Sequence, residues 1–204
     1  KSVQVERIKE AIAAGATHLG ENRVQEAQAK FAGPGTQFAD IISMDNLTLH
    51  MIGSLQRNKA HDAAALFAWI HSADSSQLLA ALDKAAQDTR AGKPLPVLLQ
   101  VNLTGEPAKS GVSVGALPAL ADAVAECKHL AGIGLMSIAR LGADESELHN
   151  TFTTLLRLLE ELRANHHGGR KPTSMGLSHN NEIAITEGDS RVALRRAICG
   201  QRRE

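Results

Sequence analysis

Lys1 and a group of small polar residues late in the chain are the residues whose types could do chemistry. Lys1 carries an amine and is the first of the 204 residues. Ser174, Gly176 and Ser178 alternate and offer hydroxyl and backbone N–H groups to an anion, and the pair Arg195-Arg196 follows them. Serine and glycine in a turn also serve as helix caps, so both roles stay open. If the polar residues act together, they indicate an anionic, phosphorylated ligand.

The elements that must position these residues alternate along the whole chain. Short apolar segments predict strands at 17–19, 47–52, 68–71, 95–103, 130–136, 173–177 and 191–194. Apolar residues at helical spacing predict helices near 5–12, 24–31, 58–67, 78–86, 114–124, 148–162 and 181–186. The segment 95–103 is nearly all apolar, which is typical of a parallel strand that is covered on both faces.

Strictly alternating strands and helices predict a parallel sheet with right-handed crossovers. Seven strands, with one more before residue 1, make the eight of a closed barrel. We therefore expect an α/β protein with a single (β/α)8 TIM-type barrel domain over residues 1–204, N-terminally incomplete because its first strand is missing before residue 1. A doubly wound open sheet is the alternative, although no glycine-rich dinucleotide fingerprint follows an early strand.

Composition narrows the classes of function. Lys+Arg and Asp+Glu both number 22, and this balance argues against a protein that binds nucleic acid or a membrane surface through charge. Cys127 and Cys199 are too few for a disulfide scaffold, which favours a cytoplasmic protein. No apolar run approaches the length of a membrane span. We expect a cytoplasmic monomer with no metal site.

A barrel would bring the candidate residues together, because function in this fold lies in the loops after the C-terminal ends of the strands. Phosphate in such barrels is commonly bound after the seventh and eighth strands. The stretch from Ser174 to Ser178 and the residues after Leu194 occupy those positions, and Lys1 stands where the missing first strand would end.

Several longer motifs have recognisable spacings. In order they are Lys1-Ser-Val, Gly20-Glu-Asn-Arg-Val-Gln-Glu26, His50-Met-Ile-Gly-Ser-Leu-Gln-Arg-Asn-Lys59, Ile70-His-Ser-Ala-Asp74, Val97-Leu-Leu-Gln-Val-Asn102, Lys109-Ser-Gly111, Gly134-Leu-Met136 and Ser174-Met-Gly-Leu-Ser178. The set closely resembles the YggS/PLPBP family, the pyridoxal-phosphate homeostasis proteins, over essentially the whole chain.

The resemblance implies a barrel like the N-terminal domain of alanine racemase, with pyridoxal 5′-phosphate (PLP) held as a Schiff base on Lys1. An imine forms from an unprotonated amine, and desolvation or neighbouring charge in a barrel mouth lowers the pKa of a lysine. The other residues that the resemblance places around the cofactor are Asn22 beside the ring, Ile52 and Gly53 along the pocket, Met175 at its flank, and Ser174 and Gly176 at the phosphate.

The last strand departs from the family's pattern. The family usually has an arginine facing the pyridine nitrogen, then an apolar residue, then Gly-Thr at the phosphate. Here the run is Ala193-Leu194-Arg195-Arg196. Either the guanidinium groups of Arg195 and Arg196 meet the phosphate, or the local alignment differs.

The resemblance leaves two main functions open. One is a PLP carrier in vitamin B6 homeostasis, without strong catalysis and with PLP-dependent apo-enzymes as possible recipients. The alternative is an amino-acid racemase of the alanine racemase type, which uses a tyrosine from a second domain, whereas this chain has no tyrosine. A phosphosugar-binding barrel is a more distant option. We favour the carrier and assign no catalytic residue, and we expect His50 and His71 to be packed, hydrogen-bonded histidines.

Overall fold

A parallel sheet forms the centre of the protein. The computed structural model describes residues 3–32, 47–106, 109–165, 172–177, 180–194 and 198. Six strands lie in the order β1-β2-β3-β4-β5-β6, and all their pairings are parallel. Their bounds are β1 His18–Glu21, β2 Thr48–Met51, β3 Trp69–Ala73, β4 Leu95–Gln100, β5 Leu130–Met136 and β6 Thr173–Ser174. A second pair, β7 Gly176–Leu177 and β8 Val192–Ala193, is also parallel.

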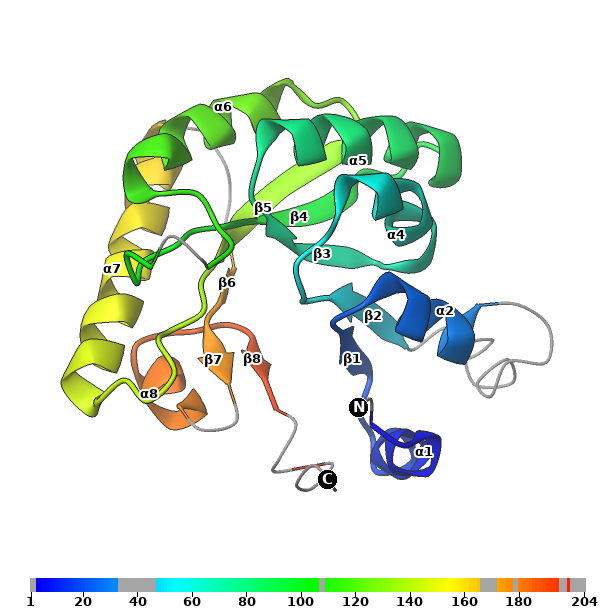
Figure 1. Cartoon of the computed structure of the whole chain (residues 1–204), viewed down its shortest axis with the longest axis horizontal. Coiled ribbons are helices and arrows are strands. Elements are labelled where there is room, and N and C mark those ends of the chain that lie inside the picture. The colour runs from blue at the N-terminus through cyan, green and yellow to red at the C-terminus, as the bar shows by residue number, and fades with distance from the viewer. Residues whose placement is uncertain are drawn as a thin grey trace.

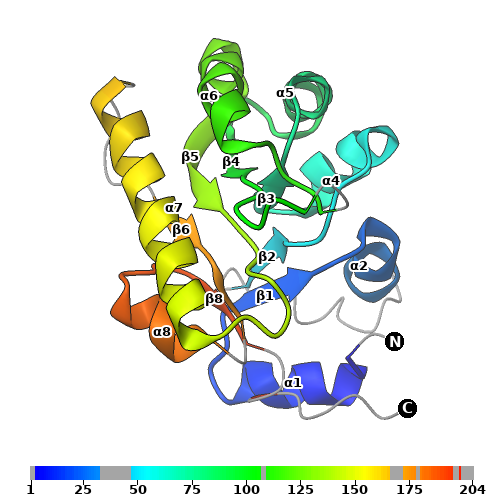
Figure 2. The same ribbon diagram turned by 60° about the vertical axis from the view of Figure 1, so that its left-hand side comes forward.

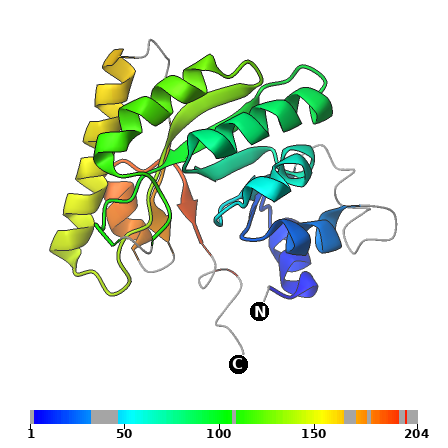
Figure 3. The ribbon, with the colours of Figure 1, turned by 45° about the horizontal axis from the view of Figure 1, so that its top comes forward.

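The sheet is curled, and helices pack along its outside (Figure 1 and Figure 2). Figure 3 shows α5 and α6 side by side over the same face of the sheet. The helices are α1 Val5–Ala13, α2 Val24–Phe31, α4 Ala60–Leu66, α5 Ser76–Thr89, α6 Leu117–Glu126, α7 Glu145–Asn165 and α8 Asn181–Thr186. Short 3-10 turns at Arg57–Lys59 and Val114–Ala116 lead into α4 and α6.

Local chemistry explains where two of these helices begin. The hydroxyl of Ser75 accepts a hydrogen bond from the Leu78 N–H at 3.3 Å, which caps α5 as a serine before an apolar run predicts. Pro118 lies in the first turn of α6, where its missing N–H costs nothing. The starts of α5 and α6 are thus determined by residues at or beside their first turns.

The core is aliphatic and lies between the sheet and its helices. Leu95, Val97 and Leu135 on β4 and β5 are fully buried, as is Phe152 on α7. The backbone comes unusually close at Gly134, where an added Cβ would lie 1.8 Å from the carbonyl oxygen of Pro172. The sequence pattern of buried parallel strands is therefore confirmed by the packing.

The predicted (β/α) barrel class is confirmed, with one correction to the strands. We predicted a single strand over 173–177, and this prediction is wrong because the segment divides at Met175 into β6 and β7. The carboxylate of Asp189 accepts the N–H groups of Met175 at 3.0 Å and Gly176 at 2.8 Å. Beyond this point the chain leaves β5 and pairs with β8.

Candidate functional site

Three of the predicted site residues meet where β1 and β2 end. The N–H of Ile52 donates to the carbonyl oxygen of Glu21 at 3.0 Å, which carries the pairing of the two strands into their loops. An added Cβ on Gly53 would lie 2.3 Å from the Asn22 carbonyl oxygen, so this close approach of two backbones requires glycine. Gly20 in turn leaves space that the Ile52 side chain fills. Asn22, Ile52 and Gly53 therefore form one compact cluster.

Ser174, Met175 and Gly176 form a second cluster where β6 gives way to β7. Met175 is buried, and Ser174 is half-buried. The N–H of Gly176 already donates to Asp189, as described above, and an added Cβ would meet the side chains of Val192 and Ala184. Gly176 thus has a packing role in this structure, and its predicted phosphate contact stays a prediction.

Asp189 is the residue that holds the second cluster in place. Besides the two N–H groups, its carboxylate accepts the hydroxyl of Thr173 at 2.9 Å and the N–H of Arg191 at 3.3 Å. Ser190 adds reciprocal bonds with the backbone of Thr173. An ionised acceptor with four donors strongly constrains the segment, because charge-assisted hydrogen bonds are the stronger kind. Asp189 is not among the site residues that the sequence motifs predict.

A row of hydrogen-bonded side chains connects the second cluster to β2 and β1. Ser174 Oγ lies 3.1 Å from His71 Nδ1, His71 Nε2 lies 2.9 Å from His50 Nδ1, and His50 Nε2 lies 2.9 Å from His18 Nδ1. His50 and His71 are 5% and 4% exposed, whereas His18 is exposed. The expectation that His50 and His71 are packed and hydrogen-bonded is confirmed.

Burial keeps the two inner imidazoles neutral. Desolvation, with smaller contributions from His18 and Arg191, lowers the pKa of His50 to about 4. Desolvation, with smaller contributions from His50 and Arg191, lowers the pKa of His71 to about 3. A neutral imidazole has one donor and one acceptor nitrogen, so each of these rings can join two neighbours in a row.

Trp69 and Arg191 lie beside this row. The guanidinium carbon of Arg191 is 3.8 Å from the centroid of the Trp69 ring, which is a cation–π arrangement. The Trp69 ring centroid lies 5.6 Å from that of His50 and 6.3 Å from that of His71. Arg191 therefore places a positive charge near the buried imidazoles, and this charge opposes their protonation.

The loop after β4 is built by its own polar side chains. The amide of Asn102 donates to the carbonyl oxygens of Glu106 at 2.8 Å and Lys109 at 3.3 Å. Gln100 donates to the carbonyl oxygen of Ser110 at 3.2 Å, and Ser110 exchanges a hydrogen bond with Ser54 at 2.8 Å. The polar residues at the end of this strand thus organise the loop and link it to the loop after β2.

Some predicted residues fall outside the part of the chain that the structure describes. These residues are Lys1, Ser178, Arg195 and Arg196. The other predicted residues form two groups, Asn22 with Ile52 and Gly53, and Ser174 with Met175 and Gly176. The histidine row runs from Ser174 across β3 and β2 to His18 on β1. The sequence signal that could have revealed the row is the presence of histidines on three successive strands.

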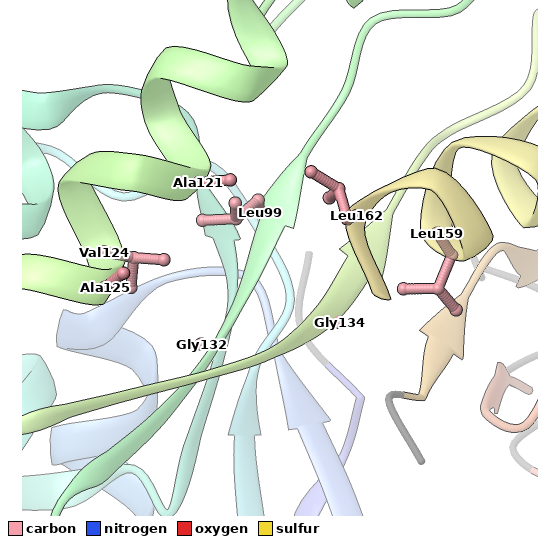
Figure 4. Close-up of a pocket in the computed structure, with 8 residues that line it drawn as sticks. All are labelled: Leu99, Ala121, Val124, Ala125, Gly132, Gly134, Leu159 and Leu162. Carbon is pink, nitrogen blue, oxygen red and sulfur yellow. The ribbon is translucent and has the colours of Figure 1, made fainter. Parts of the chain in front are cut away.

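A small apolar crevice lies elsewhere, between the sheet and the helices (Figure 4). Its lining comes from β4, β5, α6 and α7 and consists of Leu99, Ala121, Val124, Ala125, Gly132, Gly134, Leu159 and Leu162. None of these side chains can ionise or donate a hydrogen bond, so the crevice offers no chemistry for an anionic ligand.

Two other kinds of feature are absent from the described ranges. No three or more His, Cys, Asp or Glu side chains are grouped there in a way that could hold a metal ion. None of the helices found there has the length and apolar character that a membrane crossing requires.

Comparison with known proteins supports the barrel fold. The family model of the alanine racemase N-terminal domain matches residues 1–189. An alanine racemase from Corynebacterium glutamicum has a TM-score of 0.64 at 18% identity, covering 95% of this chain and 51% of its own, which supports the fold alone. The fold is thus that of the alanine racemase N-terminal barrel.

Two relatives are much more similar. The pyridoxal phosphate homeostasis protein of Pseudomonas aeruginosa is 38% identical over 196 residues, which are 96% of this chain and 79% of that protein. PipY of Synechococcus elongatus without PLP is 34% identical with a TM-score of 0.86, and PipY with PLP bound is 32% identical with a TM-score of 0.80; each match covers 96% of this chain and 87% of the PipY chain. The chain belongs to the family of pyridoxal phosphate homeostasis proteins.

Proposed function

We propose that this protein binds PLP as a Schiff base on Lys1 and serves intracellular PLP homeostasis as a carrier, without strong catalytic activity. The observation that carries this proposal is the similarity to PipY, whose structure with PLP bound matches 96% of this chain. We further propose that residues 1–204 form one monomeric, cytoplasmic PLP-binding domain that passes the cofactor to apo-enzymes.

The described residues fit such a ligand. Gln100 is 3% exposed at the end of β4, and its Oε1 accepts no hydrogen bond from the described part of the chain. A buried acceptor without a donor is costly, so a hydrogen-bond donor is expected to reach it when the site is filled. When bound, PLP supplies an aldehyde that condenses reversibly with amines.

The chain's own residues would provide the rest of the site. Ser174 offers a hydroxyl whose position is fixed by His71, so it can hold one phosphate oxygen. Asn22, Ile52 and Gly53 form a rigid wall beside the ring because Gly53 packs directly on the Asn22 backbone. Arg195 and Arg196 would add positive charge at the phosphate.

The test is an absorption spectrum of the purified protein with PLP, followed by borohydride reduction and mass spectrometry. We expect a Schiff-base band that reduction removes, with the reduced adduct on Lys1. Lys1→Ala should abolish the band, whereas Lys9→Ala, which changes an exposed lysine of α1, should keep it. A band of unchanged intensity in Lys1→Ala would refute the assignment of Lys1.

The racemase alternative needs a separate assay. We expect no appreciable racemisation of alanine at saturating substrate, because the chain has no tyrosine to return the α-proton. Sustained turnover by protein that retains its Schiff-base band would overturn the carrier function and leave the cofactor assignment intact.

A further inference from the structure

The histidine row crosses the interior of the curled sheet. In the sheet order β3 and β6 are separated by β4 and β5, yet His71 on β3 is hydrogen-bonded to Ser174 on β6. The contact between them therefore spans the concave side, and His50 and His18 continue the row to β2 and β1. Every contact between two rings joins the Nδ1 of one imidazole to the Nε2 of the next.

This pattern of contacts couples the tautomers of the three rings. If neutral His50 carries its proton on Nδ1, it donates to His71 Nε2, so neutral His71 must carry its own proton on Nδ1 and donate to Ser174. His50 Nε2 is then an acceptor, and His18 must donate to it from Nδ1. The opposite choice places all three protons on Nε2 and makes Ser174 the donor to His71.

The two states present different hydroxyl groups to a ligand. With protons on Nδ1, Ser174 accepts from His71, and its own hydroxyl proton is free to bind an oxygen that only accepts. With protons on Nε2, the Ser174 proton is used by His71, and only oxygen lone pairs are left for the ligand. A phosphate dianion is acceptor-only, whereas its protonated form, with a pKa near 6, can donate.

We propose that His18, His50 and His71 are a proton relay that sets the hydrogen-bond direction of Ser174 and exchanges a proton with a phosphate monoester bound there. The proposal rests on the proposed function, in which Ser174 holds the cofactor phosphate. A proton taken up at His18 Nε2 displaces the Nδ1 proton to His50, the next transfers go to His71 and Ser174, and the hydroxyl proton passes to the phosphate oxygen. One proton enters and one leaves, and all three imidazoles change tautomer.

The surroundings favour transfer through neutral rings. Within the described ranges, the charged group that faces the row from another part of the chain is the guanidinium of Arg191, just before β8, stacked on Trp69 of β3. His50 and His71 are buried and His18 is exposed, so the row has one end open to a proton from solvent. Glu21, on the same strand as His18, is paired with Lys30 and takes no part.

The first experiment measures the ring ¹⁵N shifts of the histidines by NMR, in the full chain without ligand at neutral pH. We expect His50 and His71 to be neutral and to share one tautomer. Opposite tautomers, or a doubly protonated ring at either position, would overturn the relay. This measurement needs no variant and no cofactor.

The second experiment adds PLP, and separately inorganic phosphate, at a pH where the phosphate is a dianion. We expect all three histidines to take the Nδ1–H form. In His50→Leu, whose side chain can neither donate nor accept a hydrogen bond, His71 should still respond to the ligand and His18 should not. An unchanged response of His18, or no response of His71, would overturn the proposal. His61→Gln, on the exposed side of α4, should behave as the unchanged protein.

Failure of the relay and failure of the proposed function give different results. If the Schiff-base band is absent but the tautomers are coupled and respond to inorganic phosphate, the cofactor assignment fails and the relay stands. If the band is present but the tautomers are independent, only the relay fails.

Ser174→Ala should weaken PLP binding about tenfold, the effect of one hydrogen bond to a charged group.

Discussion

The two halves of the sheet have different chemistry. On β4 and β5, buried leucine and valine side chains such as Leu95, Val97 and Leu135 carry the packing. On β1, β2 and β3, the interior holds a row of imidazoles that ends at Ser174. The apolar half is stabilised by burial of hydrophobic side chains, whereas the polar half has fewer apolar contacts and is held by directional hydrogen bonds. The polar row on β1 to β3 therefore depends on the apolar packing of β4 and β5 for a stable fold.

The largest expected effect comes from the apolar half. Phe152→Ala on α7 removes a fully buried ring and should lower the free energy of unfolding by about 3–5 kcal/mol. Urea unfolding followed by circular dichroism measures this change. Arg157→Ala on the same helix, which removes an exposed ion pair with Glu161, should cost no more than about 0.5 kcal/mol. Similar losses of unfolding free energy in Phe152→Ala and Arg157→Ala would contradict the conclusion that apolar burial in this half stabilises the fold.

The second largest loss of stability is expected in the polar half. There Lys30 Nζ and Glu21 Oε1 form a buried ion pair at 2.5 Å. Lys30→Met leaves the Glu21 carboxylate without its partner and should cost about 3 kcal/mol in urea unfolding. The double variant Glu21→Leu with Lys30→Met removes both charges and should recover most of that loss. A double variant less stable than the single one would show that the pair itself is strongly stabilising.

A smaller effect is expected at the predicted ring wall. Gly53→Ala places a Cβ 2.3 Å from the Asn22 carbonyl oxygen, so the backbone must shift at a cost of about 2 kcal/mol. PLP titration of the variant should show weaker binding because Asn22 moves. Gly115→Ala is the matched control, since an added Cβ there meets nothing within 4 Å. Unchanged affinity in the folded Gly53→Ala protein would remove Asn22 from the site.

The smallest expected effect is the pH dependence of the histidine row. The pKa values of His50 and His71 are lowered in the folded state to about 4 and about 3, from 6.5. The unfolded chain therefore binds more protons below pH 6.5, so stability is full above this pH and is lost as the pH falls toward these values. Thermal unfolding should show a loss of about 1–2 kcal/mol by pH 6, the sum of the two rings. The stability of the double variant His50→Gln with His71→Gln should depend less on pH over this range. An equal dependence on pH in the two proteins would show that these histidines are not its cause.

Much of the fold could be predicted because it depends on local patterns. Apolar strands such as 130–136 and the serine cap before α5 are read from neighbouring residues, and alternation of strands and helices predicts parallel pairing. The division of 173–177 could not be predicted, because its cause is Asp189, which lies more than ten residues further along the chain. Distant hydrogen bonds leave no local periodicity.

The sequence by itself determined the barrel class, the family and the motifs that predict the cofactor site, since these depend on residue types in order along the chain. Only the tertiary structure decided that His18, His50, His71 and Ser174 form one row, because four strands far apart in sequence bring them together. It also decided that Asp189 holds the segment beside Ser174. The coupling of tautomers is a property of contact geometry, which no residue of the row carries alone.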